Sequence, residues 1–209
     1  MILRKLHRAA GIAVAAFVCL HIANHLVALV GVSSHIAFMM VARLVYRQPA
    51  IETLLLISIL IQVSSGLLLF ALGWKRRSGI VPWIQAASGA YLAFFLALHV
   101  SAVFYGRTVL HLDTNFYYAA AGFFVTPYQF FFAPYYFLAV VAVFTHLGCA
   151  AYGKLDARPR VVRMLSLVLP SALGAVAALL IVLCLAGVLR PVEMPAKYMA
   201  TFAHPIHRN

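Results

Sequence analysis

The sequence predicts an all-α, polytopic membrane protein with five transmembrane helices, and three observations lead to this class. Of the 209 residues, 65% are hydrophobic and only 10% are charged. The mean hydropathy of +0.99 lies far above the range of soluble proteins. Sixteen Lys and Arg residues face four acids, and these basic residues cluster at the ends of apolar segments, as topology signals do. The composition therefore indicates membrane lipid as a partner and argues against nucleic-acid binding.

The first apolar segment, residues 9–31, contains no formal charge. As a helix it is long enough to cross a hydrocarbon core of roughly 30 Å at about 1.5 Å per residue. Residues 1–8 are basic and imitate the start of a signal peptide, but the apolar run is too long and has no small-residue cleavage site. We therefore expect an uncleaved first span.

Four further spans are predicted from apolar length: residues 51–73, 82–105, 128–152 and 163–189. We expect residues 1–190 to form a single transmembrane domain with a four-helix bundle core. Residues 191–209 form a short polar tail, which we expect to be loosely ordered.

Two connections on one side of the membrane are predicted to be more than plain loops. Arg43 and Arg47 lie four residues apart on an otherwise apolar helix that ends at Pro49, a pattern suited to the membrane interface. In the connection 107–129, the segment 113–115 (Asp-Thr-Asn) can cap a short helix. Together these interfacial segments are expected to cover one end of the bundle.

The distribution of positive charge predicts the orientation. The side that holds the N-terminus carries ten Lys and Arg residues, and the other side carries six. The positive-inside rule then places the N-terminus in the cytoplasm and the C-terminus outside, most naturally in a bacterial inner membrane.

Four of the nine histidines lie inside predicted spans, where an imidazole that faces lipid is costly: His21, His25, His99 and His146. The other five fall at span ends or in loops, where solvated or interfacial roles are expected: His7, His35, His111, His204 and His207. His7 is a partial exception, because it lies five helical turns below His25 on the same helix face.

His25 and His99 each lie 17 residues into their spans, so both are expected about 25 Å from the same membrane face. Two imidazoles at one depth on two helices can hold a haem iron between them. His21 is an alternative ligand, or a hydrogen-bonding group near the cofactor edge. Taken singly, each of these histidines is better explained by a hydrogen bond to a neighbouring hydroxyl, amide or carbonyl. As a set they favour a shared ligand.

His146 lies nearer the N-terminal side of the membrane and has no histidine partner on the second span. That span offers Gln62 and Ser65, so a hydrogen bond from His146 to one of them is the expected state. The residues therefore support one haem rather than two.

The opening RKLHRAAG (Arg4 to Gly11), with histidines in spans one, three and four, resembles the five-helix cytochrome b anchors of succinate dehydrogenase and fumarate reductase. The resemblance implies that His25, or His21, and His99 bind an outer haem b, with His146 as half of an inner pair whose partner is replaced near Gln62. It also implies quinone as electron-transfer partner and a soluble dehydrogenase on the cytoplasmic face.

The function that follows is a b-type cytochrome membrane subunit, which has no catalytic motif of its own. Arg43, Arg47 and Arg107 are candidates to bind haem propionates by charge-assisted hydrogen bonds. Taken singly, each of these arginines is better explained by topology and by contact with lipid headgroups.

Three alternatives stay open. The chain is equally compatible with a haem-free membrane scaffold or assembly protein that shares the anchor fold. A proton-coupled transporter is disfavoured by the near absence of intramembrane carboxylates. A membrane enzyme built on His111 and Asp113 has only their adjacency in its support.

Overall fold

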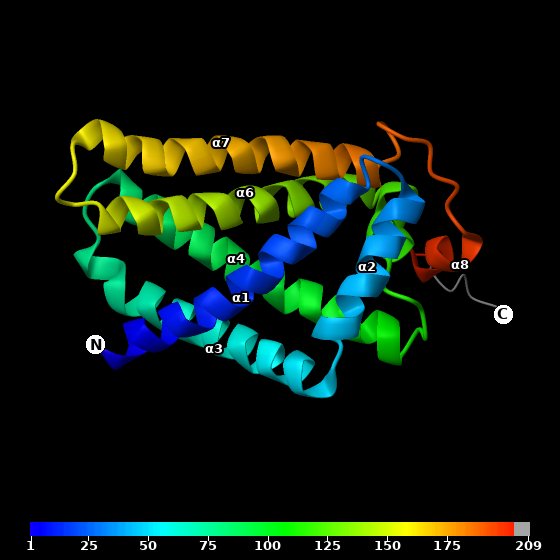
Figure 1. Ribbon diagram of the computed structural model, residues 1–209, viewed down its shortest axis with the longest axis horizontal. Helices are drawn as coiled ribbons and strands as arrows, with labels where there is room; N and C mark the ends of the chain where they lie inside the picture. The colour runs from blue at the N-terminus through cyan, green and yellow to red at the C-terminus, as the bar shows by residue number, and fades with distance from the viewer. Residues whose placement is uncertain (203–209) are drawn as a thin grey trace.

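The computed structural model describes residues 1–202, and all regular elements within that range are helices (Figure 1). Five are long: α1 (Ile2–Val27), α3 (Pro49–Gly73), α4 (Ile80–Thr108), α6 (Gln129–Lys154) and α7 (Arg160–Leu185). Three are shorter: α2 (Val32–Tyr46), α5 (Phe116–Ala120) and α8 (Ala196–Met199). Short 3-10 helices follow α3, α5 and α8: η1 (Trp74–Arg76), η2 (Ala121–Phe123) and η3 (Ala200–Phe202).

Each of these five helices has the length and the apolar composition needed to cross a membrane. The predicted fold class is confirmed, and the chain is an integral membrane protein. The first helix begins at Ile2 rather than at residue 9, because the basic segment before the apolar run contains no helix breaker and continues the same helix. Pro134 and Pro170 lie inside α6 and α7 without ending either helix.

The spans pack in two groups, with α1 against α3, and with α4 and α7 on either side of α6. Glycines allow α6 and α7 to approach closely. A Cβ atom on Gly148 would lie 3.2 Å from the backbone of Leu167, and one on Gly174 would lie 2.6 Å from the Cβ atom of Phe144. Close approach of helices at small residues is a usual basis of packing within membranes.

Gly174→Ala is therefore expected to destabilise the protein by about 1 to 3 kcal/mol, the usual cost of overpacking a close contact. The measurement is the thermal unfolding midpoint in detergent. Gly153→Ala on α6 is the matched control, because a Cβ atom there meets no heavy atom within 4 Å. Equal midpoints for the two variants would contradict this account of the α6–α7 contact.

The two ends of the bundle differ in character (Figure 1). The basic end comprises residues 1–8, the turn 74–79 and the connection 154–163. The opposite end, here called the capped end, is covered by α2, α5 and α8. The Asn115 side chain accepts a hydrogen bond from the backbone N–H of Tyr117 at 3.0 Å, so the predicted cap of the short helix is confirmed.

A hydrophobic cluster holds the capped end together. It joins α5 to α7 and to the end of α1, and its buried members are Ala28, Phe116, Ala120, Ile181, Cys184 and Leu185. Phe116 is only 1% exposed, so the short helix is anchored in the core rather than lying loosely on it.

The prediction that the tail is loosely ordered is wrong for its described part, residues 191–202. Tyr198 is 2% exposed, and its ring stacks on Tyr117 with the centroids 5.8 Å apart. Val192 and Met194 also pack against the hydrophobic cluster, so several apolar side chains dock this segment on the capped end. His204 and His207 lie outside the described residues.

Candidate functional site

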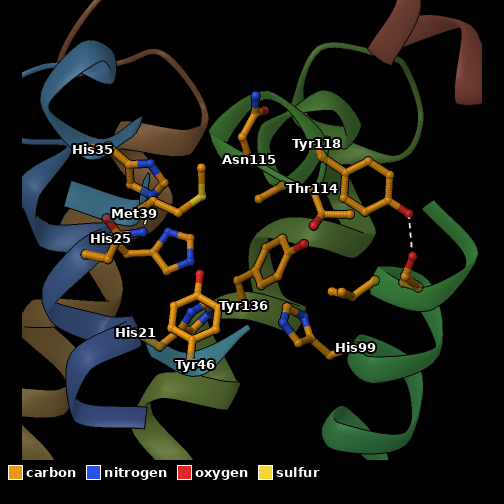
Figure 2. Close-up of a pocket in the computed structure, with 14 residues that line it drawn as sticks. His21, His25, His35, Met39, Tyr46, His99, Thr114, Asn115, Tyr118 and Tyr136 are labelled. Atoms are coloured by element: carbon orange, nitrogen blue, oxygen red, sulfur yellow. Dashed lines mark hydrogen bonds between the residues drawn. The ribbon is translucent and has the colours of Figure 1, made fainter. Parts of the chain in front are cut away.

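A pocket lies at the capped end between α1, α2, α4 and α6 (Figure 2). Its polar and sulfur-containing lining is His21, Asn24, His25, His35, Met39, Tyr46, His99, Thr114, Asn115, Tyr118 and Tyr136. The cavity has a volume of about 80 Å³, which is room for several water molecules. Polar groups of this kind are unusual at the core of a membrane bundle and mark a candidate site.

Four imidazoles converge on this pocket from three helices. The ring centroids of His21 and His99 are 6.0 Å apart, across the gap between α1 and α4. His25 lies one helical turn from His21, with the two centroids 4.7 Å apart, and its ring is 5.3 Å from that of His35. The structure therefore brings together the three histidines predicted from the sequence, and His21 rather than His25 has the ring contact with His99.

The side chains of His21, His25 and His99 make no hydrogen bond to any residue of the described range 1–202, and Nδ1 of His25 is fully buried. His21 and His99 make ring contacts instead, stacking on Phe17 and Phe95 with centroid distances of 5.5 and 5.0 Å. A buried imidazole nitrogen without a partner is costly, and this applies to Nδ1 of His25. The ring nitrogens of His21 and His99 have no protein partner within residues 1–202 either, so all three rings are available to an additional ligand.

The other two histidines inside the spans are, by contrast, hydrogen-bonded. On α1, Nδ1 of His7 lies 2.9 Å from Oγ of Ser65, and its Nε2 accepts from Gln62 at 3.2 Å. A Cβ atom on Gly66 would lie 3.2 Å from the His7 ring, so this glycine makes room for it.

The expected hydrogen bond from His146 to Gln62 or Ser65 is wrong. Nδ1 of His146 donates to the backbone carbonyl of Gln85 at 3.1 Å and lies 3.2 Å from Oγ of Ser88. The reason is the pairing of the helices, because α6 packs on α4 whereas α3 packs on α1. His146 is thus remote from the capped-end pocket and is bound within the α4–α6 contact.

The expectation of a solvated or interfacial His35 is also wrong. The residue lies within α2, its side chain is 2% exposed, and its Nε2 accepts from the Asn24 amide at 3.1 Å. His35, Met39 and Tyr46 recur at helical spacing and line the pocket from one face of α2. This spacing is the sequence signal for a pocket-facing side of α2, and an interfacial helix that begins after His35 omits its first member.

Stability is expected to fall on acidification through His35. Burial lowers the pKa of His35 to about 4, with a smaller effect of the same sign from His21 and Arg43. The unfolded chain then binds more protons than the folded chain between about pH 6.5 and 4, so unfolding becomes easier as the pH falls. Between about pH 7.5 and 5 the loss is about 2 kcal/mol.

Thermal midpoints at these two pH values measure the effect, with His35→Gln as the control. The control is expected to show a shallower pH dependence than the parent protein. An equally steep dependence in both would assign the effect to other groups.

The three predicted arginines are placed at the capped end, but two of them already have acidic partners. Arg43 forms an ion pair with Asp113 at 2.7 Å, and Arg107 forms one with Glu52. Arg47 donates to the hydroxyl of Thr114 at 3.1 Å and has no acid partner within residues 1–202. Burial, and then the nearby Arg43 and Arg107, lower the pKa of Arg47, so an anion beside it would be stabilising. The Arg43–Asp113 ion pair also engages the carboxylate that a membrane enzyme built on His111 and Asp113 would need.

Within residues 1–202, no group of three or more His, Cys, Asp or Glu side chains is arranged to hold a metal ion. Two imidazoles that bind one metal from opposite sides at about 2 Å place their ring centres about 6 Å apart, as they are in His21 and His99.

Two tyrosines, Tyr46 and Tyr136, project into the pocket (Figure 2). The Tyr136 ring lies 6.5 Å from that of His99, and neither phenol hydroxyl has a hydrogen-bond partner among residues 1–202. The cavity of about 80 Å³ is smaller than a haem, so a macrocycle requires these two rings to turn aside. A haem would fit between His21 and His99 only with these rings displaced.

The fold and the site together define an integral membrane protein with a histidine-lined pocket near one end of its bundle. Comparisons with protein-family models, with curated proteins and with solved structures found no match. The resemblance to cytochrome b anchors consequently rests on the residues alone.

Proposed function

We propose that this membrane protein is a b-type cytochrome subunit that binds one haem at the capped end and exchanges electrons with membrane quinone. One observation carries the proposal. Three imidazoles from two spans, His21, His25 and His99, converge on one pocket and lack hydrogen-bond partners in the described chain, whereas His7 and His146 have them.

In this proposal His99 from α4 and His21 from α1 would hold the haem. The separation of their rings supports this pair, and His25 is the alternative on α1. Haem iron, when bound, supplies one-electron chemistry whose potential is set by its axial ligands and by burial. The chain's own contribution is to orient the two imidazoles and to surround them with apolar and aromatic side chains.

Arg47 is the candidate to bind a propionate, since it lacks the acidic partner that Arg43 and Arg107 possess. The unpartnered hydroxyls of Tyr46 and Tyr136 are candidate donors to a quinone carbonyl or to a second propionate. Of the three arginines, Arg47 is therefore the preferred candidate to bind a propionate.

The orientation belongs to the same proposal. The positive-inside rule places the basic end in the cytoplasm of a bacterial inner membrane and the haem pocket in the outer half of the bilayer. A soluble dehydrogenase would then dock on the basic end, about the thickness of the membrane away from the pocket. Because a dehydrogenase at the basic end would be this far from a haem at the capped end, membrane quinone is the nearer electron partner.

The experiment is reduction of the purified, lipid-reconstituted protein by a soluble quinol, followed by optical difference spectroscopy. The proposal expects a b-type spectrum that appears on addition of quinol and returns to the oxidised form with an oxidised quinone. A haem that only dithionite reduces would contradict the quinone assignment. Absence of haem would instead favour the alternative, a haem-free scaffold or assembly protein with Tyr46 and Tyr136 filling the pocket.

A further inference from the structure

The basic end carries a large excess of positive charge that the protein does not neutralise. Its three segments contain ten Lys and Arg residues and one acid, Asp156. Asp156 pairs with Arg163 at 2.7 Å, and none of the other nine cations has an acid partner within residues 1–202. The exposed cations include Lys75 and Arg76 in the turn between α3 and α4.

The two tryptophans of the chain flank this turn, with Trp74 at its start and Trp83 in the first turn of α4. Trp74 is 52% exposed and Trp83 is 38% exposed, and their rings meet edge to face with centroids 5.0 Å apart. Neither indole N–H has a hydrogen-bond partner in the described chain. Exposed tryptophans at the ends of membrane spans lie at the level of the lipid headgroups, with the ring in the acyl region and the N–H toward polar atoms.

Arg77 fixes the shape of this turn. Its guanidinium lies over the rings of Phe70 and Trp83, at 4.7 and 5.3 Å from their centroids. Nη2 donates to the backbone carbonyl of Phe70 at 2.7 Å, which satisfies an end carbonyl of α3, while the buried Nη1 has no acceptor in residues 1–202. The turn thus presents two indole N–H donors and two free cations beside a guanidinium that lacks one acceptor.

We propose that Trp74, Lys75, Arg76 and Trp83 form a binding site for the headgroup of an anionic phospholipid. Phosphate oxygens supply the acceptors that the two exposed indoles lack, and the negative charge offsets the unpaired cations Lys75 and Arg76. An acidic soluble protein would account for the cations but not for two exposed tryptophans at the depth of the membrane interface. This inference is independent of haem binding.

The experiment uses the full-length protein in phosphatidylcholine vesicles and reads its tryptophan fluorescence. Trp74 and Trp83 are the only two tryptophans, so all the signal arises at the proposed site. Brominated phosphatidylglycerol is expected to quench this fluorescence more strongly than brominated phosphatidylcholine at the same mole fraction. High salt should reduce the difference.

The variant Lys75→Gln/Arg76→Gln is expected to weaken the preference for the anionic lipid on the order of tenfold, since each cation near a membrane surface contributes substantially to the attraction. Lys197→Gln is the matched control, because Lys197 is an exposed cation at the capped end and should leave the preference unchanged. Equal quenching by the two lipids in the parent protein would overturn the proposal and leave the charge of the basic end to an acidic protein partner. Equal effects of Lys75→Gln/Arg76→Gln and Lys197→Gln would also overturn the proposal, because the preference for anionic lipid would then not depend on the cations of this turn.

Discussion

The variant His99→Ala is expected to lose haem completely. Among the residues that line the pocket, His99 is the only imidazole on the α4 side, while the other three come from α1 and α2. Without it, an iron bound to His21 would have no second axial ligand from the opposite wall. The measurement is the haem content of the purified variant together with its reduced optical spectrum.

Two further variants separate ligand loss from general damage. His146→Ala removes a histidine that donates to the carbonyl of Gln85 within the α4–α6 contact, so the haem content is expected to be unchanged. His99→Met keeps a side chain able to ligate haem iron, so we expect retained haem with a raised reduction potential. Full haem content in His99→Ala would contradict the proposed ligation.

The second large effect is expected from His21→Ala, compared with His25→Ala. The ring of His21 is the one in contact with His99, whereas the ring of His25 contacts those of His21 and His35. We therefore expect His21→Ala to lose haem, and His25→Ala to retain most of it. Haem content of both variants, purified under identical conditions, is the measurement.

If haem were lost only in His25→Ala, His25 would be the α1 ligand. Its depth, matched to that of His99, would then be a better guide than the ring contact between His21 and His99. Loss in neither variant would show that the two residues substitute for each other, because they lie one turn apart on the same face of α1. That result would contradict the assignment of a single α1 ligand.

The transmembrane architecture could be predicted from the sequence because it depends on local properties. A run of apolar residues of sufficient length specifies a span, and the segment 113–115 specifies a helix cap, without knowledge of any neighbour. The convergence of His21, His25 and His99 followed from their depth, since rise per residue is nearly constant in a helix.

The incorrect predictions all concern contacts between segments far apart in the sequence. The partner of His146 depends on α6 packing against α4, and nothing in the composition of either helix specifies this pairing. The burial of His35 depends on α2 docking over the pocket, and that of Tyr198 on the tail returning to the capped end. Depth in the membrane, estimated from rise per residue, also could not distinguish His21 from His25. The two differ by one helical turn, which is the error of that estimate.

The pairing of the arginines illustrates the same point. Arg43 and Asp113 are 70 residues apart, and Arg107 and Glu52 are 55 residues apart, yet both pairs meet at the capped end. Only the three-dimensional arrangement distinguishes Arg47 as the cation without an acid. The sequence analysis names all three arginines as candidate propionate ligands, but the preference for Arg47 could not be predicted from sequence alone.

The most direct test of the proposed function is the haem-to-protein ratio of the purified protein, measured from the reduced pyridine complex of the extracted haem. The account predicts about one haem b per chain, held by His99 and an α1 histidine. A ratio of zero, in protein produced with ample haem and exposed to haem after purification, would contradict it.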